Sequence, residues 1–541
     1  MGSVLRDLRY GLRTILKDPG FALVAILTLA LGIGANSTLF SVVDGILLRP
    51  LPFPDPGRLV ALWENVPEKG WNQEPLSYPD FADWEAQARS FEGMAAYTYV
   101  GSVLGEGTSA EFVTGAAVSA DLFPLLQARP AFGRVFTRDE DRPGGRRVVV
   151  LGQGLWERRF QSKPNLIGQE ILLDGQSFTV VGIMPEPFNF PIPGSPRGYW
   201  IPLAADPETR ERLQLRGTHY LRLVARLRDG VTSQQAEMDL EAIARRLEKG
   251  YPDTNHGFRA RVVPLQEELV GDVRQALLVL LGAVGFVLLI ACANIANLLL
   301  ARASSRRKEI AIRSALGAGW RRIVQQLLAE SLLLSLAGGA AGLLVAVWGV
   351  DLLTRLAPGQ IPRVREIGLD LRVVGFTLVV SLLTGILAGL APALRAARPS
   401  LDPDLRNGRG GEAEGWRRNR LRALLVVSEV ALSLVLLAGA GLMLRSLQRL
   451  RGVDPGFNPS HVLTVKLSLP GSHYAGGEQR TALFERLIEQ VRAMPGVRAA
   501  GVVFSLPLGG SNRSNSFGSP GAPTPPGNPR TRTTALSAQS I

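Results

Sequence analysis

Five long apolar runs constrain this chain more than any other feature of its sequence. They cover Phe21–Val43, Ala276–Leu300, Leu327–Val350, Val373–Leu394 and Leu421–Leu444. At about 1.5 Å per residue, helices of this length cross a hydrocarbon core of about 30 Å. The first run is too long for a signal-peptide core and no small-x-small cleavage site follows it, so we interpret it as an uncleaved anchor. The alternative is a set of buried helices in a soluble enzyme, and five such runs in one chain argue against it.

Basic residues flank these runs on alternating sides. They precede the first run, separate the second from the third, and separate the fourth from the fifth, whereas the segment between the third and fourth has mixed charge. Because cytoplasmic loops carry the excess of Lys and Arg, we expect the N-terminus and the three basic segments to be cytoplasmic. The net charge of +13 therefore needs no nucleic acid to explain it. The fifth run is the weakest prediction, because it contains Glu429.

The segment from Arg49 to Gln275 contains no membrane-length run and alternates between strand and helix patterns. We predict strands at Leu59–Trp63, Met94–Tyr99, Arg147–Leu151, within Gly168–Pro185 around a type I′ turn at Asp174–Gly175, at His219–Gly230 and at Phe258–Leu265, and helices at Pro79–Arg89, Gly152–Phe160 and Val231–Gly250. Thr232 is the expected N-cap of the last helix and Gly250 is expected past its end. The predicted fold class is an α-helical membrane protein of about five spans, with an α+β extracytoplasmic domain inserted between the first and second.

A similar pattern begins again after the fifth run. His461–Pro470 reads as a strand, Gln479–Met494 as an amphipathic helix and Gly496–Leu508 as a strand. Leu483, Phe484, Leu487, Ile488 and Val491 mark the apolar face of that helix. We interpret this as an internal duplication whose second copy is incomplete. From Ser511 the chain is rich in Pro, Ser, Thr and Gly, which is typical of a disordered tail; a truncation or reading-frame error is our hypothesis for the early end.

These observations give a complete predicted plan. It consists of a cytoplasmic basic segment at 1–20, transmembrane helices at 21–48, 276–301, 327–350, 373–394 and 421–444, extracytoplasmic segments at 49–275, 351–372 and 445–510, cytoplasmic segments at 302–326 and 395–420, and a low-complexity tail at 511–541. Four scattered histidines and the single Cys292 form no metal-ligand spacing, and no cofactor is expected. The predicted localisation is the bacterial inner membrane.

Small and polar residues inside the runs predict close helix packing. Gly338 and Gly342 are four residues apart, as are Gly385 and Gly389, and such pairs let helix backbones approach. Asn294 and Asn297 lie three apart in the second run, where hydrogen-bonded packing between helices is favoured over a ligand role.

The cytoplasmic segment Arg302–Gln326 carries seven basic residues and one acidic residue, Glu309. Glu309 precedes Arg313 by four residues, the favourable order for an ion pair on a helix surface. Gly317 and Gly319 interrupt the helix pattern before the third run. We therefore predict a short helix along the membrane surface, a glycine break and a second helix that enters the membrane.

The stretch RRKEIAIRSALGAGWRRIVQQLLAES resembles the signature of FtsX/MacB-type ABC permeases. The N-terminal stretch LRYGLRTILKDPGFALVAILTLALGIGANSTLFSVVDGILLRPLPFPDP resembles more narrowly the duplicated permeases of Acidobacteria and their relatives, in which the whole unit occurs twice. The resemblance covers about residues 1–510, and the early end of the second copy departs from it. It implies one anchor, an extracytoplasmic domain, three clustered spans, and a cytoplasmic ATPase that binds the permease through the helix after the second span.

The resemblance also implies site residues. The positions that match the family's ATPase-coupling stretch are Arg307, Lys308, Glu309, Ile310, Ile312, Arg313, Ala315, Leu316, Gly317 and Ala318. The chain has no Walker A pattern, so we expect no ATP hydrolysis by the chain itself, and a role in efflux, extraction or mechanotransmission. The alternative is that these residues only end a helix and, through their positive charge, set the orientation of the chain in the membrane. A second possible function is that of an orphan membrane-anchored sensor or scaffold that works without an ATPase. The partner in the membrane could be a second copy of the chain or the missing half of the repeat.

Overall fold

The computed structural model describes residues 13, 16–186, 188, 190, 191, 198–305, 320–356, 367–396, 411–454, 456, 458, 461–465, 467, 469 and 477–503. The chain divides into two compact units. The helical unit comprises Met1–Arg49 and Val270–Val453, and the second unit comprises Pro50–Leu269 and Asp454–Ile541. We call Pro50–Leu269 the sheet domain and describe the units separately.

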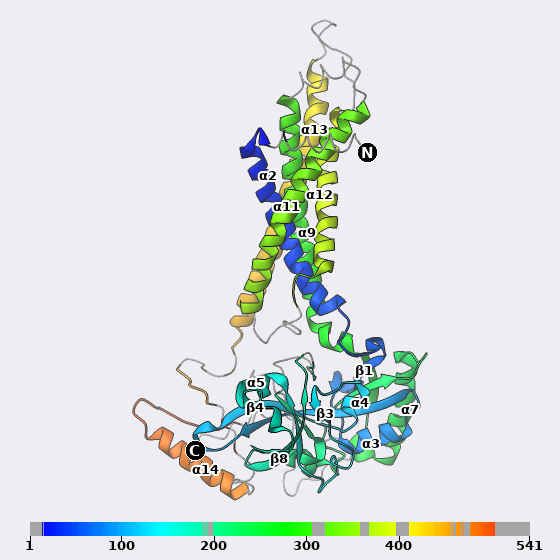
Figure 1. Ribbon diagram of the computed structural model, residues 1–541, viewed down its shortest axis with the longest axis vertical. Coiled ribbons are helices and arrows are strands. Elements are labelled where there is room, and N and C mark those ends of the chain that lie inside the picture. Colours follow the sequence, from blue (N-terminus) through cyan, green and yellow to red (C-terminus); the bar gives the residue numbers. More distant parts are fainter. Residues whose placement is uncertain are drawn as a thin grey trace. The chain divides into compact units, whose positions relative to one another are not determined.

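Within its described residues, the helical unit contains five helices long and apolar enough to cross a membrane (Figure 1). They are α2 (Pro19–Val43), which continues as the π-helical turn η1 (Asp44–Leu48), α9 (Leu265–Ser305), α11 (Trp320–Leu356), α12 (Leu371–Ala396) and α13 (Gly411–Arg451). Each of the five predicted runs falls inside one of these helices. Helix α2 begins at Pro19. Proline has no N–H group, but the first N–H groups of a helix have no intrahelical acceptor, so no hydrogen bond is lost there. The Asp18 carboxylate caps the helix by accepting a hydrogen bond from the Phe21 N–H.

Several helices are longer than the sequence indicated. Helix α9 begins at Leu265, so the last residues of the segment predicted as extracytoplasmic, 49–275, already belong to the second span helix. Helix α13 begins at Gly411 and ends at Arg451, so part of the predicted cytoplasmic linker 395–420 is helical. Hydropathy marks only the part of a helix that matches the bilayer, and the polar turns at its ends carry no such signal.

The sheet domain is built on a mixed sheet of 11 strands. Its strands are β1 (Leu59–Val66), β2 (Trp71–Glu74), β3 (Phe91–Leu104), β4 (Glu111–Val118), β5 (Phe132–Gly133), β6 (Val148–Gly152), β7 (Glu170–Leu173), β8 (Gln176–Met184), β9 (Tyr199–Pro202), β10 (Arg222–Leu227) and β11 (Arg259–Pro264). They lie in the order β11-β1-β10-β3-β4-β9-β6-β8-β5, with β2 beside β1 and β7 beside β3 and β8. The β4–β9 and β6–β8 pairs are parallel, and the others are antiparallel.

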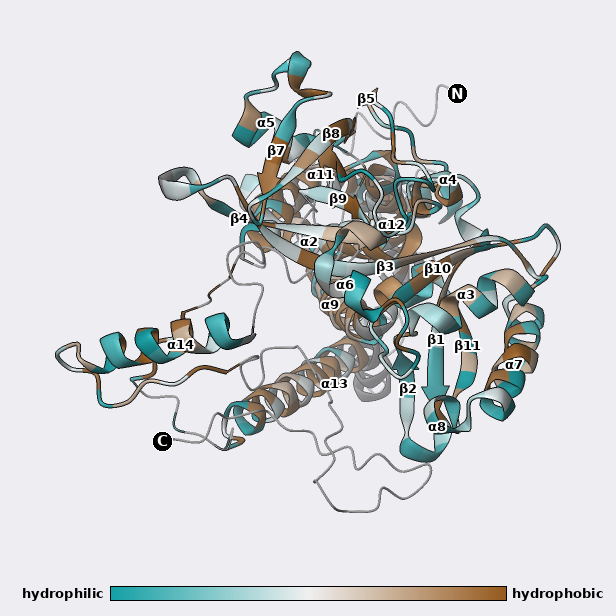
Figure 2. Cartoon of the chain, turned by 90° about the horizontal axis from the view of Figure 1, so that it is seen from below, coloured by the Kyte–Doolittle hydropathy of each residue, from teal (hydrophilic) through white to brown (hydrophobic). Residues whose placement is uncertain are grey.

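Short helices connect these strands. They are α3 (Tyr78–Gln87), α4 (Leu122–Leu125), α5 (Gln153–Phe160), α6 (Pro207–Arg212), α7 (Ser233–Gly250) and α8 (Pro252–Asn255), with single turns η2 (Pro56–Arg58), η3 (Pro67–Lys69), η4 (Gly107–Ser109), η5 (Pro164–Leu166) and η6 (Leu203–Ala205). Helix α7 buries Ala236, Leu240, Ile243 and Leu247 at helical spacing, and these join Trp84 and the inward residues of the strands in one core. Figure 2 shows hydrophobic and hydrophilic residues interspersed along α7.

Most of the predicted elements of the sheet domain are confirmed. The turn between β7 and β8 has positive φ at both Asp174 and Gly175, as a type I′ turn requires. Thr232 caps α7, and its hydroxyl and the Gln235 side chain form a capping box. The prediction for Gly250 was wrong: it is the last residue of the helix, and Tyr251 follows as the C-cap. Strands β4 and β9 were missed, because neither shows an alternating pattern of polar and apolar residues.

The C-terminal segment differs from the prediction. Helix α14 (Gly477–Arg492) confirms the predicted amphipathic helix, and the five residues of its apolar face are all half-buried. The described residues of 461–503, however, contain no strand where two were predicted. A strand pattern needs a neighbouring strand for its N–H and C=O groups, and an isolated strand is not stable in water. The second domain therefore stays a prediction.

Candidate functional site

A close helix contact in the helical unit joins α2 to α11. A Cβ atom added to Gly338 would lie 2.5 Å from the Cβ atom of Leu29, and one added to Gly342 would lie 3.1 Å from the backbone N of Gly34. The first distance is shorter than a normal carbon contact allows, and the second is tighter than most such contacts. The two glycines therefore let the backbones of α2 and α11 meet without intervening side chains.

A similar contact joins α11 to α12. The Cβ position of Gly385 on α12 lies 3.1 Å from the Cα atom of Leu332 and faces the Ser335 hydroxyl, and that of Gly389 faces the Ser331 hydroxyl. Ser331 and Ser335 donate to the carbonyls of their own helix, at Leu328 and Leu332. Since their hydroxyls are satisfied within α11, the serines act here as small spacers between the helices.

Polar side chains of α2 cross-link it to its neighbours. The buried Asn36 side-chain amide donates to the carbonyl of Gly32 at 2.9 Å and to the carbonyl of Val284, on α9, at 2.8 Å. The Ser37 hydroxyl lies 2.7 Å from the Thr377 hydroxyl of α12, and both side chains are buried. In an apolar surrounding such bonds are hard to replace, so they fix the register of α2 against α9 and α12.

An ion-pair cluster ties the end of α2 to the start of α12. The Arg49 guanidinium lies 2.7 Å from Asp370 Oδ2 and 3.9 Å from Asp44, which is 3% exposed. Arg372 lies 3.6 Å from the other oxygen of Asp44. Asp44 opens the π-helical turn η1, and π-turns are concentrated at functional positions of helices. The cluster holds the point at which the chain leaves α2 for the sheet domain.

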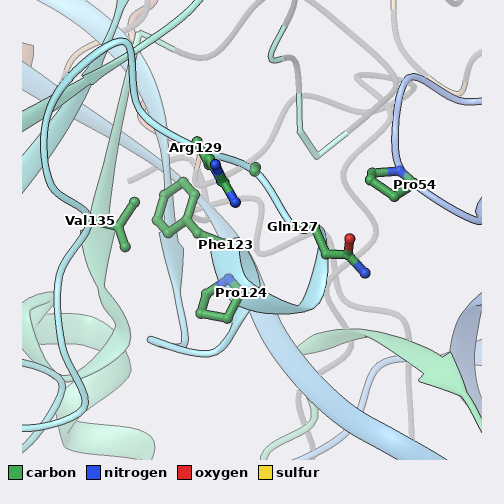
Figure 3. A pocket seen from close by; sticks show the side chains of 7 residues that line it. Pro54, Phe123, Pro124, Gln127, Arg129 and Val135 are labelled. Atoms are coloured by element: carbon green, nitrogen blue, oxygen red, sulfur yellow. The ribbon is translucent and has the colours of Figure 1, made fainter.

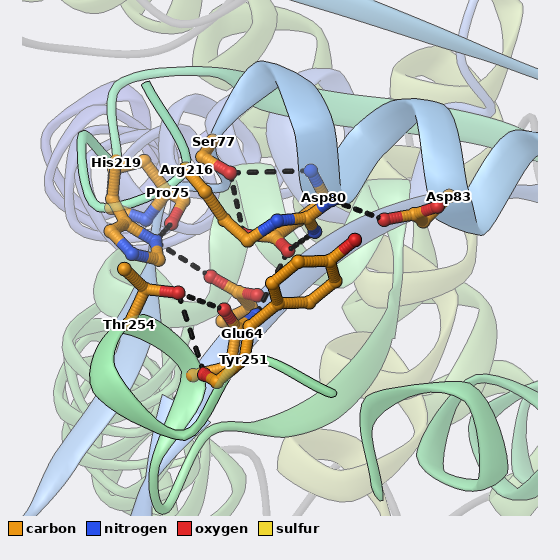
Figure 4. Close-up of polar contacts among 10 residues, drawn as sticks. Glu64, Pro75, Ser77, Asp80, Asp83, Arg216, His219, Tyr251 and Thr254 are labelled. Atoms are coloured by element: carbon orange, nitrogen blue, oxygen red, sulfur yellow. Dashed lines mark hydrogen bonds and ion pairs between the residues drawn. The ribbon is translucent and has the colours of Figure 1, made fainter. Parts of the chain in front are cut away.

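The sheet domain contains a buried polar cluster between α3, β1 and the loop before β10 (Figure 4). Asp80 is fully buried, and its Oδ1 accepts from Arg216 at 2.6 Å and from Asn255 at 2.9 Å. The Ser77 hydroxyl donates to its Oδ2. Close by, Glu64 Oε2 lies 2.8 Å from Nδ1 of His219.

The titration of this cluster is strongly perturbed. Burial raises the pKa of Glu64 to about 7, against the opposing effect of His219. Burial lowers the pKa of His219, but the adjacent Glu64 carboxylate outweighs it and the net shift is upward. Glu64, Asp80 and His219 have ligand-type atoms within 4.8 Å of one another, as a cation would need. The oxygens of Asp80 are already occupied by Arg216, Asn255 and Ser77, so internal ion pairs account for the cluster without a metal.

A shallow pocket of about 530 Å³ lies on another part of the sheet domain (Figure 3). Figure 3 shows Gln127 and Phe123 on one segment and Pro54 on a separate segment across from Gln127. Arg129 is the one charged residue among those that line it. The pocket therefore offers apolar contact and a single positive charge.

Comparison with known families finds matches in both units of the chain. The family model of the MacB-like periplasmic core domain matches residues 22–243, and that of the FtsX-like permease C-terminal region matches residues 281–401. The two matches follow each other along the chain, and the second one spans the helices α11 and α12 with their packed glycines. The chain belongs to the FtsX/MacB-type ABC permeases.

Individual relatives of this permease include the macrolide export ATP-binding/permease protein MacB of Salmonella typhi, which is 29% identical over 294 residues, or 54% of this chain and 42% of the relative. The pyoverdine export ATP-binding/permease protein PvdT of Pseudomonas syringae pv. tomato is 28% identical over 293 residues, or 52% and 40%. The chain thus spans less than half the length of these relatives. The periplasmic region of MacB from Actinobacillus actinomycetemcomitans superimposes with a TM-score of 0.30 and 13% identity, over 43% of this chain and 98% of that one.

The predicted ATPase-coupling residues of this permease, Arg307 to Ala318, lie outside the described residues. The four predicted packing glycines lie at the helix contacts described above. Asn294 and Asn297 form no side-chain hydrogen bond with any residue that the structure describes, and Asn297 Oδ1 is buried without a partner there. Their predicted packing role stays a prediction.

Two features of the permease were missed from the sequence. Asn36 and Ser37 lie in the first run, where the polar stretch Asn36–Thr38 was the available signal. Glu330 is a carboxylate inside the third run and is 4% exposed on α11. Charged residues within a span are costly and are usually retained for function, so Glu330 could have been singled out.

Proposed function

We propose that this chain is a permease subunit that couples a separate cytoplasmic ATPase to movement of its extracytoplasmic domain, for efflux, extraction or mechanotransmission. The observation that carries the proposal is the order of the two matched regions, with the sheet domain between the first and second apolar helices. A domain inserted there has two covalent links to the helices, one after α2 and one before α9. Movement of either helix would therefore act on it directly.

The packing of the helical unit supports this role. Helices α2, α11 and α12 are joined by glycine contacts and by the Ser37–Thr377 bond, so they are expected to move as a block. The segment Arg302–Gln326 leads directly into α11. A push on that segment would reach α2 through Gly338 and Gly342, and then the sheet domain through its covalent link to the end of α2.

Hydrolysis of ATP is assigned in this proposal to another subunit. The 541 residues contain no Gly-Lys-Ser/Thr phosphate loop, whereas MacB and PvdT are named ATP-binding/permease proteins. We infer a cytoplasmic N-terminus from the basic flanks. The polar contact residues for the ATPase would be Glu309 and Arg313, with Ile312 and Leu316 as the apolar contact and Gly317 at the bend.

The test is purification of the full chain from its native membranes in mild detergent, followed by identification of any ATPase that co-purifies. The Glu309→Ala/Leu316→Ala variant should lose the ATPase at an unchanged membrane level. A matched control, Glu106→Ala/Leu215→Ala, removes the same residue types from the exposed surface of the sheet domain and should retain it. Absence of an ATPase from well-folded wild-type protein would favour an orphan sensor or scaffold.

A further inference from the structure

Three arginines line one polar pocket of the sheet domain. The pocket has a volume of about 370 Å³ and is lined by Arg146, Arg147 and Arg210, together with Gly145, Glu170 and Ser177. All three arginine side chains are exposed. The pocket lies at different residues from those of the buried Asp80 cluster and of the pocket shown in Figure 3.

The topology of the sheet brings these arginines together. Arg147 precedes β6, and its carbonyl accepts from the Thr179 N–H of β8 at 2.9 Å. Strand β9 runs antiparallel to β6, with Leu151 opposite Tyr199 and Val150 opposite Trp200. The end of β9 therefore lies beside the start of β6, and the chain that follows it carries Arg210 on α6. The site is assembled from three separate segments of the domain.

A tight turn presents Arg146 to the pocket. The Gly145 N–H donates to the Arg142 carbonyl at 2.8 Å, and Gly144 has a φ of +85°. A Cβ atom on Gly145 would lie 2.8 Å from the Glu140 carbonyl oxygen and 3.0 Å from that of Asp139. Because these neighbours are backbone atoms, the turn admits only glycine at this position.

The guanidinium groups of this pocket form no ion pair with any residue that the structure describes. Several other arginines of the domain are paired: Arg216 lies 2.7 Å from Asp83, and Arg158 lies 2.7 Å from Glu111. Among the residues that the structure describes, the side chains of Arg146, Arg147 and Arg210 have no hydrogen-bond or ion-pair partner. The pocket's own carboxylate, Glu170, accepts instead from the Ser177 hydroxyl at 2.5 Å.

We propose that this pocket binds the phosphate group of a small anionic ligand, either a free phosphate compound or a lipid headgroup. Three guanidinium groups and one carboxylate leave a local charge of about +2, which a phosphate dianion balances and a single carboxylate does not. The planar guanidinium group of arginine donates two parallel N–H bonds to a pair of phosphate oxygens. Several guanidinium groups without ion-pair partners around one pocket are therefore suited to bind a phosphate group. This site is independent of the proposed coupling to an ATPase.

Equilibrium dialysis of the purified full chain with radiolabelled inorganic phosphate tests the proposal, at about pH 8, where phosphate is doubly charged. The Arg147→Gln/Arg210→Gln variant should bind at least about tenfold more weakly, since it loses two charge-assisted contacts. The control variant Arg89→Gln/Arg228→Gln removes the same charge from two other exposed arginines of the sheet domain and should bind as the wild type does. Equal weakening in both variants would reduce the effect to net charge and overturn the proposal.

A second arm separates the two sources of phosphate. Short-chain phosphatidic acid is compared with short-chain phosphatidylcholine, whose headgroup has no net charge. If phosphatidic acid binds about tenfold more tightly than inorganic phosphate, and the Arg147→Gln/Arg210→Gln variant loses this binding, the ligand is a lipid headgroup. If the two affinities are equal, the ligand is a free phosphate compound. Wild-type protein that binds neither probe would overturn the proposal.

Discussion

Arg49 and Asp370 form an ion pair of 2.7 Å that joins the end of the first apolar helix to the start of the fourth. Asp370 does two things at once. Its Oδ1 accepts from the N–H groups of Arg372 and Val373 and so caps α12, while its Oδ2 faces Arg49. The cap orients the carboxylate before the pair forms, which lowers the entropy cost of the pair.

We therefore predict measurable coupling between Arg49 and Asp370. Arg49→Gln, Asp370→Asn and the double variant form a thermodynamic cycle, and the asparagine keeps an oxygen for the cap. The expected coupling energy is about 1 kcal/mol, at the upper end for partly exposed pairs, because the carboxylate is pre-oriented. The measurement is the free energy of unfolding of the detergent-purified chain in chemical denaturant.

The control cycle uses Arg355→Gln and Asp351→Asn. That pair is 3.0 Å apart on one helix, and its side chains are 76% and 58% exposed. Its expected coupling is about 0.3 kcal/mol. If the Arg49–Asp370 coupling does not exceed this value, the pair is an ordinary surface contact and not a fixed joint.

The fold was predictable wherever a periodic pattern exists in the chain itself. The apolar runs and the alternating strands around Asp174 carry their own signal, and so does Thr232 at the start of α7. Strand β9 contains four consecutive buried residues, and such a short apolar stretch does not distinguish a strand from a buried loop. Its identity depends on β4 and β6, which pair with it from distant parts of the sequence.

The candidate sites were predictable only in part, for the same reason. Glycine spacing indicates a close contact, so Gly338 and Gly342 could be selected, but not their respective partners Leu29 and Gly34. Glu64 and His219 are 155 residues apart, and no local pattern relates them. The three arginines of the 370 Å³ pocket likewise meet only through the strand order of the sheet.

Gly338→Ala is predicted to destabilise the contact between α2 and α11. The new Cβ atom would meet the Cβ atom of Leu29 at 2.5 Å, so the helices must move apart. Overpacking of this kind costs about 1–3 kcal/mol of unfolding free energy. Gly285→Ala on α9 is the matched control, because no atom lies within 4 Å of its Cβ position, and alanine there should be neutral or stabilising. Equal effects of the two substitutions would contradict the close-contact interpretation.

Asn36→Ala is predicted to loosen α2 from α9. It removes the 2.8 Å bond to the Val284 carbonyl, and such bonds inside membranes contribute about 0.6–1.7 kcal/mol. The control is Asn294→Ala, which removes a half-buried asparagine that forms no side-chain hydrogen bond in the described part of the chain. The unfolding free energy should fall for Asn36→Ala and change little for Asn294→Ala. A larger loss at Asn294 would point to a contact with residues outside the described ranges.

The stability of the sheet domain is predicted to fall as pH rises from about 6 to about 7, because in this range the buried Glu64 beside His219 keeps its proton only in the folded state. Burial raises the pKa of Glu64 to about 7, and the Glu64 carboxylate raises the pKa of His219 in spite of burial. A group with a raised pKa binds its proton more tightly in the folded state, so its stabilisation is present at low pH and is lost as pH rises through the folded pKa. Each proton involved contributes a slope of about 1.4 kcal/mol per pH unit within that window.

The matched variants for this pH effect are Glu64→Gln and Asp141→Asn. The first keeps an oxygen near His219 but removes the titration of residue 64, so the slope between about pH 6 and about 7 should become flatter than in the wild type. Asp141 is half-buried and desolvation raises its pKa to about 6, so its loss of stabilisation is largely complete below this window and Asp141→Asn should keep the wild-type slope. The measurement is the free energy of unfolding as a function of pH, followed by tryptophan fluorescence. A Glu64→Gln profile as steep as that of the wild type would show that other groups cause the pH dependence.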